Sequence, residues 1–155
     1  MILMFGGNGQ LGQELIRAAG ARAAVLRGLS HADADISDPS AVATALALWK
    51  PDLVINAAAY TKVDLAETEL EEARRGNEIG PGVLASACAR ACVPMVHIST
   101  DYVFDGSKEG AYLESDPVCP ISAWAQQSGW RGCGPQPPEE SRDPAYRMGL
   151  QRVRP

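Results

Sequence analysis

Short apolar runs alternate with longer segments of helical spacing along most of this chain. The runs have the length of β-strands, and their apolar residues are continuous, which is typical of strands buried on both faces. The longer segments repeat apolar residues every three or four positions, which predicts helices. The predicted strands are residues 2–5, 23–26, 52–59 and 93–100, and the predicted helices are residues 13–21, 37–50 and 64–92, the last interrupted near residues 80–82.

This alternation predicts the fold class. We expect an α/β protein with a Rossmann-like, doubly wound parallel sheet of about four strands and helices on both faces. No helical or strand period can be found from Trp124 onward. The chain therefore divides into an incomplete Rossmann-like domain, residues 1–123, and an irregular C-terminal tail, residues 124–155.

Composition narrows the class of protein. The 155 residues are enough for one domain, 46% of them are hydrophobic, and the formal net charge is −5. A chain without a dense Lys/Arg face is not expected to bind nucleic acid. The apolar run at the N-terminus is too short for a signal or membrane segment. We therefore expect a cytoplasmic protein with small-molecule partners and no membrane contact.

The four cysteines form no CxxC pair. Cys88 and Cys92 are expected on one face of the last predicted helix, among alanines. We interpret these two, together with Cys119 and Cys133, as buried or idle thiols, and we predict no metal site.

Three glycines follow the first predicted strand and precede the first predicted helix. Gly6, Gly9 and Gly12 form the pattern G-x-x-G-x-x-G. Glycine permits a tight turn and lets backbone N–H groups approach a pyrophosphate without a Cβ in the way. This position predicts dinucleotide binding, although three glycines in a loop can also form an ordinary turn.

Two further positions could border the adenosine of a dinucleotide. Arg27 follows the second predicted strand, where a guanidinium would suit a 2′-phosphate and favour NADP over NAD; it could equally be a solvated surface arginine. Asp35 and Ile36 come next, and they could border the adenine. Alternatively, Asp35 could simply help to open the following helix.

Four segments give the chain a specific resemblance. "GGNGQLG", "DISDP", "NAAAYTKVDLAETE" and "STDYVFDG" occur in the order and approximate spacing of the dTDP-4-dehydrorhamnose reductases, members of the extended short-chain dehydrogenase/reductase superfamily. The third and fourth segments are quite specific to these reductases, whereas the whole superfamily shares the glycine pattern. The resemblance extends from Met1 to about Ala123.

The resemblance implies a cofactor, NADPH or NADH, and a substrate, a dTDP-linked 4-keto-6-deoxy sugar. It also implies a role for individual residues. Two alternatives remain: "HIST" could be merely a strand end whose hydroxyls cap the next turn, and Tyr60 and Tyr102 could be ordinary packing residues. By resemblance, Gly9, Gln10 and Leu11 line the pyrophosphate; Asp35 and Ile36 the adenosine; Ala59, Tyr60 and Thr61 the cofactor edge; Ile98 the nicotinamide side; Thr100 is catalytic and binds the substrate carbonyl, and Asp101 contacts the sugar nucleotide.

The family's reaction also needs a proton donor. The resemblance implies hydride transfer to C4 of the sugar, with a tyrosine as acid and a lysine four residues later lowering its pKa. This Tyr-x-x-x-Lys pair belongs just after "CPISA", where the chain has Trp124 and Ser128. Neither side chain can replace the acid or the cation.

Divergence could explain this departure, but a frameshift explains it better. Codons for residues 124–131, read one base later, can spell Gly-x-Ser-Lys, the family's continuation after the tyrosine, and the leftover T begins a tyrosine codon. The segment "RDPAYRMGL", read in the same frame, permits a strand like the family's next one. We therefore interpret residues 124–155 as an out-of-frame tail.

The expected function follows from these points. We predict a dTDP-4-dehydrorhamnose reductase by lineage, and an inactive fragment as the chain stands. The missing continuation would leave the fourth strand as an exposed apolar edge, so we expect marginal stability. Two alternatives remain open: a non-catalytic nucleotide-binding or regulatory module of the same superfamily, and a sugar-nucleotide epimerase relative.

Overall fold

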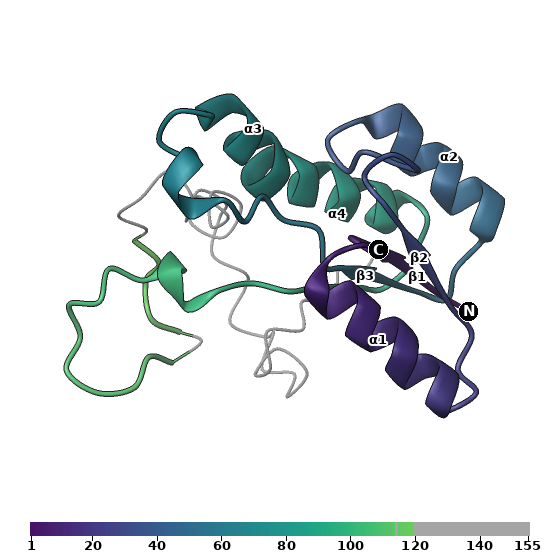
Figure 1. The fold of residues 1–155 in the computed structure, drawn as a ribbon, viewed down its shortest axis with the longest axis horizontal. Coiled ribbons are helices and arrows are strands. Elements are labelled where there is room, and N and C mark those ends of the chain that lie inside the picture. Colours follow the sequence, from purple (N-terminus) through teal and green to yellow (C-terminus); the bar gives the residue numbers. More distant parts are fainter. Residues whose placement is uncertain (114, 120–155) are drawn as a thin grey trace.

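The computed structural model describes residues 1–113 and 115–119. The predicted irregular tail, Trp124 to Pro155, lies outside these residues. In the described part, parallel strands alternate with helices, as predicted (Figure 1). The strands are β1 (Ile2–Phe5), β2 (Leu26–Leu29), β3 (Leu53–Asn56) and β4 (Met95–His97); the helices are α1 (Gln10–Ala21), α2 (Pro39–Trp49), α3 (Leu70–Arg74), the π-helical turn η2 (Arg75–Ile79) and α4 (Gly80–Arg90), with 3-10 turns η1 (Val63–Leu65) and η3 (Asp101–Val103).

The sheet has the strand order β2-β1-β3-β4, and all its pairs are parallel. Helix α1 covers one face, while α2 and α4 cover the other and pack against each other (Figure 1). This arrangement confirms the predicted doubly wound fold. Within the described part of the chain, β2 and β4 form the two edges of the sheet.

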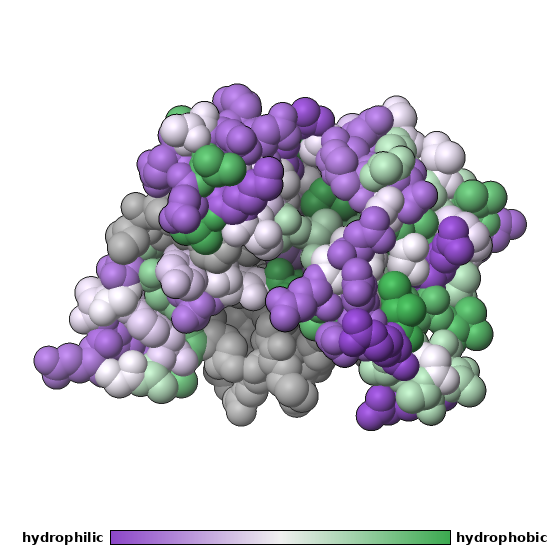
Figure 2. All heavy atoms as spheres, viewed as in Figure 1, coloured by the Kyte–Doolittle hydropathy of each residue, from purple (hydrophilic) through white to green (hydrophobic). Residues whose placement is uncertain are grey.

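The core lies between the sheet and the α2–α4 layer. Each parallel strand is buried on this face, so the strands contribute large apolar side chains that are almost fully inaccessible. Figure 2 shows that hydrophilic side chains gather instead over the acidic segment around α3. The core includes Leu3, Phe5, Val42, Leu46, Val54, Leu84, Cys88 and Met95.

The predicted second strand is wrong by three residues, since β2 begins at Leu26 and ends at Leu29. Ala23 has φ 52° and Ala24 N–H donates to the Ala19 carbonyl, so this stretch closes α1. Gly28 does not end the strand; the Cβ of any other residue there would lie 2.9 Å from Cδ1 of Ile16 on α1. The glycine thus allows α1 to pack closely on β2.

The predicted break near residues 80–82 is also wrong. The chain stays helical from Leu70 to Arg90, and η2 joins α3 to α4 without a loop. Gly80 N–H donates to the Arg75 carbonyl, five residues back, which widens the turn. Pro81 has no N–H to donate, so the helix lacks one backbone hydrogen bond directly after the widened turn.

Cys88 and Cys92 do not share a helix face. Cys88 is buried in α4, and burial raises the pKa of its thiol to about 11. Cys92 lies beyond the helix end, exposed, with φ 55°. Val93 N–H donates to the Cys88 carbonyl and Cys92 N–H to the Ala89 carbonyl, which is the Schellman pattern of a helix C-terminus.

Cys92→Gly is therefore expected to stabilise the protein by about 1 kcal/mol, because glycine adopts the left-handed conformation without steric cost. The free energy of unfolding, measured by urea denaturation, tests this. Cys92→Ala is the control and should leave that free energy nearly unchanged. A loss of stability in the glycine variant would show that the Cys92 side chain contributes more than its backbone costs.

Candidate cofactor site

The four strands end in one row. Leu29, Phe5, Asn56 and His97 are register partners from one edge of the sheet to the other. The segments that follow the strands therefore emerge at a common edge. The chain leaves β1 for β2 on one side and later enters β3 on the other, and in open α/β sheets ligands bind where the order reverses in this way.

The glycine loop lies at this reversal. Gly6 has φ +88°, and a Cβ there would lie 2.5 Å from the Ala57 carbonyl carbon after β3. A Cβ on Gly12 would lie 2.2 Å from the Gly6 carbonyl oxygen. Both positions therefore require glycine, since backbone atoms would have to move to admit any other residue.

The same loop leaves the start of α1 open. Gly9 caps the helix with extended backbone and offers no side-chain acceptor to the first helical amides. Such amides and the helix dipole attract an anion. The structure thus brings together the predicted pyrophosphate residues Gly6, Gly9, Gln10, Leu11 and Gly12, of which Gly9, Gln10 and Leu11 are exposed.

Side-chain amides fix the segment that follows β3. Asn56 is fully buried; its Oδ1 accepts from Ala58 N–H at 3.1 Å, and its Nδ2 lies 3.1 Å from Nδ1 of His97 on β4. Asn77 of η2 holds Tyr60, since its Oδ1 accepts from Tyr60 N–H at 2.8 Å and its Nδ2 donates to the Tyr60 carbonyl at 3.1 Å.

Tyr60 has a defined partner for its hydroxyl. The hydroxyl donates to Oε2 of Glu69 at 2.6 Å. Burial and this carboxylate raise the pKa of Tyr60 to about 12. The predicted neighbours Ala59 and Thr61 are exposed at the same edge.

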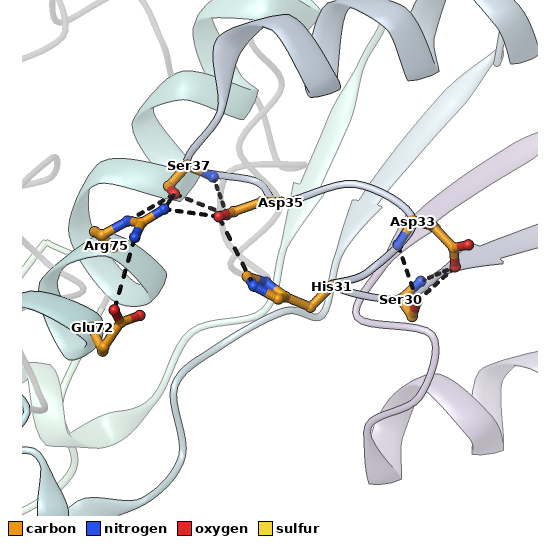
Figure 3. A network of polar contacts seen from close by, with 7 residues as sticks. All are labelled: Ser30, His31, Asp33, Asp35, Ser37, Glu72 and Arg75. Atoms are coloured by element: carbon orange, nitrogen blue, oxygen red, sulfur yellow. Dashed lines mark hydrogen bonds and ion pairs between the residues drawn. The ribbon is translucent and has the colours of Figure 1, made fainter.

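A polar network joins the loop before α2 to η2 (Figure 3). Oδ1 of Asp35 accepts from the backbone N–H and the hydroxyl of Ser37, each at 2.8 Å. Oδ2 of Asp35 accepts from Nη2 of Arg75 at 3.0 Å, and Nε2 of His31 lies 4.0 Å away. The predicted neighbour Ile36 is buried, and a Cβ on Gly80 of α4 would lie 2.5 Å from its Cγ1. The side chain of Ile36 therefore belongs to the core.

Arg27 does not follow the second strand, as the sequence led us to expect, but lies inside it. Its guanidinium lies over the Trp49 ring, with Cζ 4.9 Å from the ring centroid. Ser30 and His31 are the residues that follow β2. The error in the strand boundary therefore removes the geometric basis for a 2′-phosphate contact by Arg27.

The segment after β4 carries the remaining predicted residues. Ile98 N–H donates to the Asn56 carbonyl at 3.0 Å and its side chain is 40% exposed. Thr100 caps η3, because its Oγ1 accepts from Tyr102 N–H at 3.4 Å; it also donates to Oδ1 of Asp101 at 3.2 Å. The capping that the sequence left open as an alternative is thus present, at a residue of intermediate exposure.

Residues 1–113 and 115–119 hold no cluster of three His, Cys, Asp or Glu side chains arranged for a metal ion. The helices of this same part are too short or too polar to cross a membrane.

The Asp35 network predicts a dependence of stability on pH. Partial burial alone would raise the pKa of Asp35, but the hydrogen bonds from Ser37 and the charges of His31 and Arg75 outweigh it and hold the pKa below its ordinary value. A lowered pKa means that the ionised network stabilises the fold fully above about pH 4, the ordinary value for aspartate, and loses this effect as the pH falls further.

Asp35→Asn is accordingly expected to lower the free energy of unfolding at pH 7 and to lessen its decline below about pH 4. Urea denaturation between pH 7 and pH 3 measures both effects. Asp64→Asn, at an exposed position in η1, is the control. An Asp35→Asn profile parallel to the wild-type profile would contradict the assignment.

Comparison with known proteins agrees with this geometry. Residues 1–132 match the family described as RmlD substrate binding domain. A dTDP-4-dehydrorhamnose reductase of Burkholderia thailandensis is 46% identical over 123 residues, which cover 79% of this chain and 41% of the relative. One of Aggregatibacter actinomycetemcomitans is 39% identical, over 81% of this chain and 43% of the relative. The chain thus spans about two fifths of the length of these relatives.

Solved structures show the same relationship. The crystal structure of a dTDP-4-dehydrorhamnose reductase from Clostridium acetobutylicum has a TM-score of 0.76 and 39% identity, covering 81% of this chain and 45% of that one. The Bacillus anthracis reductase in complex with NADP has a TM-score of 0.77 and 33% identity, covering 83% and 46%. These matches confirm the resemblance predicted from the motifs, and this chain belongs to the family of RmlD substrate-binding domains.

Proposed function

We propose that this chain is the cofactor-binding part of an NAD(P)H-dependent reductase, by lineage a dTDP-4-dehydrorhamnose reductase of dTDP-L-rhamnose biosynthesis. The observation that carries the proposal is the glycine cradle at the reversal of the sheet, where the loop that opens α1 lies against the segment after β3. No Cβ obstructs the cradle, so a pyrophosphate can approach the backbone. The Bacillus anthracis relative, in complex with NADP, supports this choice of ligand.

The proposed ligand runs across the strand ends. The amides at the start of α1 bind the pyrophosphate, the loop with Asp35 and Ile36 borders the adenosine, and Ile98 lies on the nicotinamide side, with NADPH or NADH as cofactor. The cofactor would supply the hydride. Ala59, Tyr60 and Thr61 border its middle, and Thr100 and Asp101 face the dTDP-linked 4-keto-6-deoxy sugar.

The proposal includes a limit on catalysis. Thr100 can donate a hydrogen bond to a substrate carbonyl, but its aliphatic hydroxyl is too weak an acid to supply the proton that the reduction needs. Tyr60 is a poor acid at neutral pH, because its pKa is about 12 and its hydroxyl is bound to Glu69. Trp124 and Ser128, which stand at the family's Tyr-x-x-x-Lys positions, lie outside the described residues. We therefore place this chain among non-catalytic binders. We also propose that it is cytoplasmic and has no nucleic-acid partner.

Calorimetric titration of the purified chain with NADPH and NADH tests cofactor binding. We expect saturable binding of at least one of them, and circular dichroism shows in parallel whether the sample is folded. A folded chain that binds neither dinucleotide would overturn the proposal.

A further inference from the structure

The π-helical turn η2 contacts two of the loops at the cofactor edge. On one side, Asn77 bonds both backbone groups of Tyr60, and it is only 1% exposed. Gly76 lies against the same residue, because a Cβ there would be 3.2 Å from the Tyr60 nitrogen and Cβ. The segment after β3 therefore rests on η2 through side-chain and backbone contacts.

On the other side, η2 holds the loop before α2. Arg75 donates from Nη2 to Asp35 at 3.0 Å and to the Ser37 hydroxyl at 3.1 Å (Figure 3). Arg75 also lies 3.8 Å from Glu72, one turn back. The two loops thus depend on residues only two positions apart in one helical turn.

We propose that Asn77 is a positioning residue of the cofactor site, acting through the Tyr60 backbone, and that Arg75 has the same role for the Asp35 loop. The inference rests on the proposed function, because it assumes that these loops face a dinucleotide. The buried Asn77 amide bonds the N–H and the carbonyl of Tyr60, and through this peptide it can act on the cofactor. Its donor and acceptor together fix the orientation of that peptide, which lowers the entropy lost on binding.

The two residues should affect different halves of the ligand. The segment held by Asn77 begins at Ala57 and Ala58, whose backbone packs on Gly6 beside the start of α1. It therefore faces the middle of the dinucleotide and its nicotinamide half. The loop held by Arg75 follows β2, on the adenosine side. A π turn is a common device at functional sites, where it directs side chains out of the regular helical repeat.

Titration of Asn77→Leu, Arg75→Gln and wild type with NADPH and with 2′,5′-ADP tests this division. Leucine matches the size of asparagine but removes both hydrogen bonds. We expect Asn77→Leu to weaken NADPH binding at least tenfold and 2′,5′-ADP binding less than twofold. Arg75→Gln should weaken both ligands by a similar factor, since both contain the adenosine half.

Two variants and one further measurement make the result decisive. Asn77→Asp keeps the acceptor for Tyr60 N–H, so we expect it to fold and to bind NADPH with intermediate affinity. This variant carries the test if Asn77→Leu does not fold. Glu78→Gln, in the same turn, should bind both ligands like wild type. Hydrogen exchange in the peptide covering residues 57–61 should speed up in Asn77→Leu, while that of β1 stays unchanged.

Equal weakening of both ligands in Asn77→Leu, or no weakening in either asparagine variant, would overturn the inference and leave Asn77 a purely structural residue. If wild type binds neither ligand while folded, the proposed function itself fails and the inference falls with it.

Discussion

Gly12→Ala is expected to abolish measurable NADPH binding and to destabilise the domain. The new Cβ would lie 2.2 Å from the Gly6 carbonyl oxygen and 3.0 Å from Cα of Gly7, so the start of α1 must move away from the loop. Backbone overlap of this kind costs about 1–3 kcal/mol or more, a large part of a domain's stability of about 5–15 kcal/mol. The same movement separates the helical amides from the pyrophosphate.

Calorimetric titration with NADPH and thermal unfolding measure the two effects. Gly20→Ala is the matched control in the same helix, where nothing lies within 4 Å of the added methyl group; it should bind NADPH normally and gain up to about 1 kcal/mol. Gly9→Ala separates binding from folding, since its Cβ meets the Gly6 carbonyl oxygen at a milder 3.3 Å. Normal NADPH affinity in Gly12→Ala would show that the cradle is not the binding site.

The chain of this sequence is expected to show no turnover, and restoration of the reading frame after the Ala123 codon is expected to produce a reductase. General acid catalysis alone contributes about 10²–10⁴-fold, and the sequence has Trp124 and Ser128 where the resemblance implies the acid and its activating cation. The assay follows NADPH oxidation with a dTDP-4-keto-6-deoxy sugar, for this chain and for the frame-restored protein.

A frame-restored protein in which the recovered tyrosine is replaced by tryptophan is the control for this comparison, and it should be inactive. NADPH-dependent reduction of the sugar by the present sequence would refute the assignment. Sequencing the DNA around the Ala123 codon tests the proposed frameshift and, where it is found, distinguishes a genomic lesion from a sequencing error.

The regular part of the fold could be predicted because local pattern and tertiary structure agree there. The apolar runs that became β1, β3 and β4 need burial on both faces. Val42 and Leu46 form the apolar stripe of α2, which covers one of these faces. The pattern failed at β2, because Gly28 lies inside the strand, where it allows close packing against Ile16 of α1. No local sequence rule contains this contact. The same shift of boundary misplaced Arg27.

The supporting residues of the site could not be predicted from the sequence. Asn77 and Arg75 act through contacts with Tyr60 and Asp35, which lie far from them along the chain. Their positions within a predicted helix gave no signal for these contacts. Asn56 gave one available signal, an amide at the end of an otherwise apolar strand, which must find a partner when buried.

The π turn also sets the phase between the two helices that it joins. A π turn contains one residue more than an α turn, and each helical residue rotates the chain by about 100°. Deletion of a single residue within η2 would narrow this turn to an α turn and keep Leu84 and Cys88 on the core face, whereas deletion of a residue within α4 would rotate the rest of that helix and carry Cys88 out of the core. A single-residue deletion should therefore be tolerated better in this turn than within α4 itself.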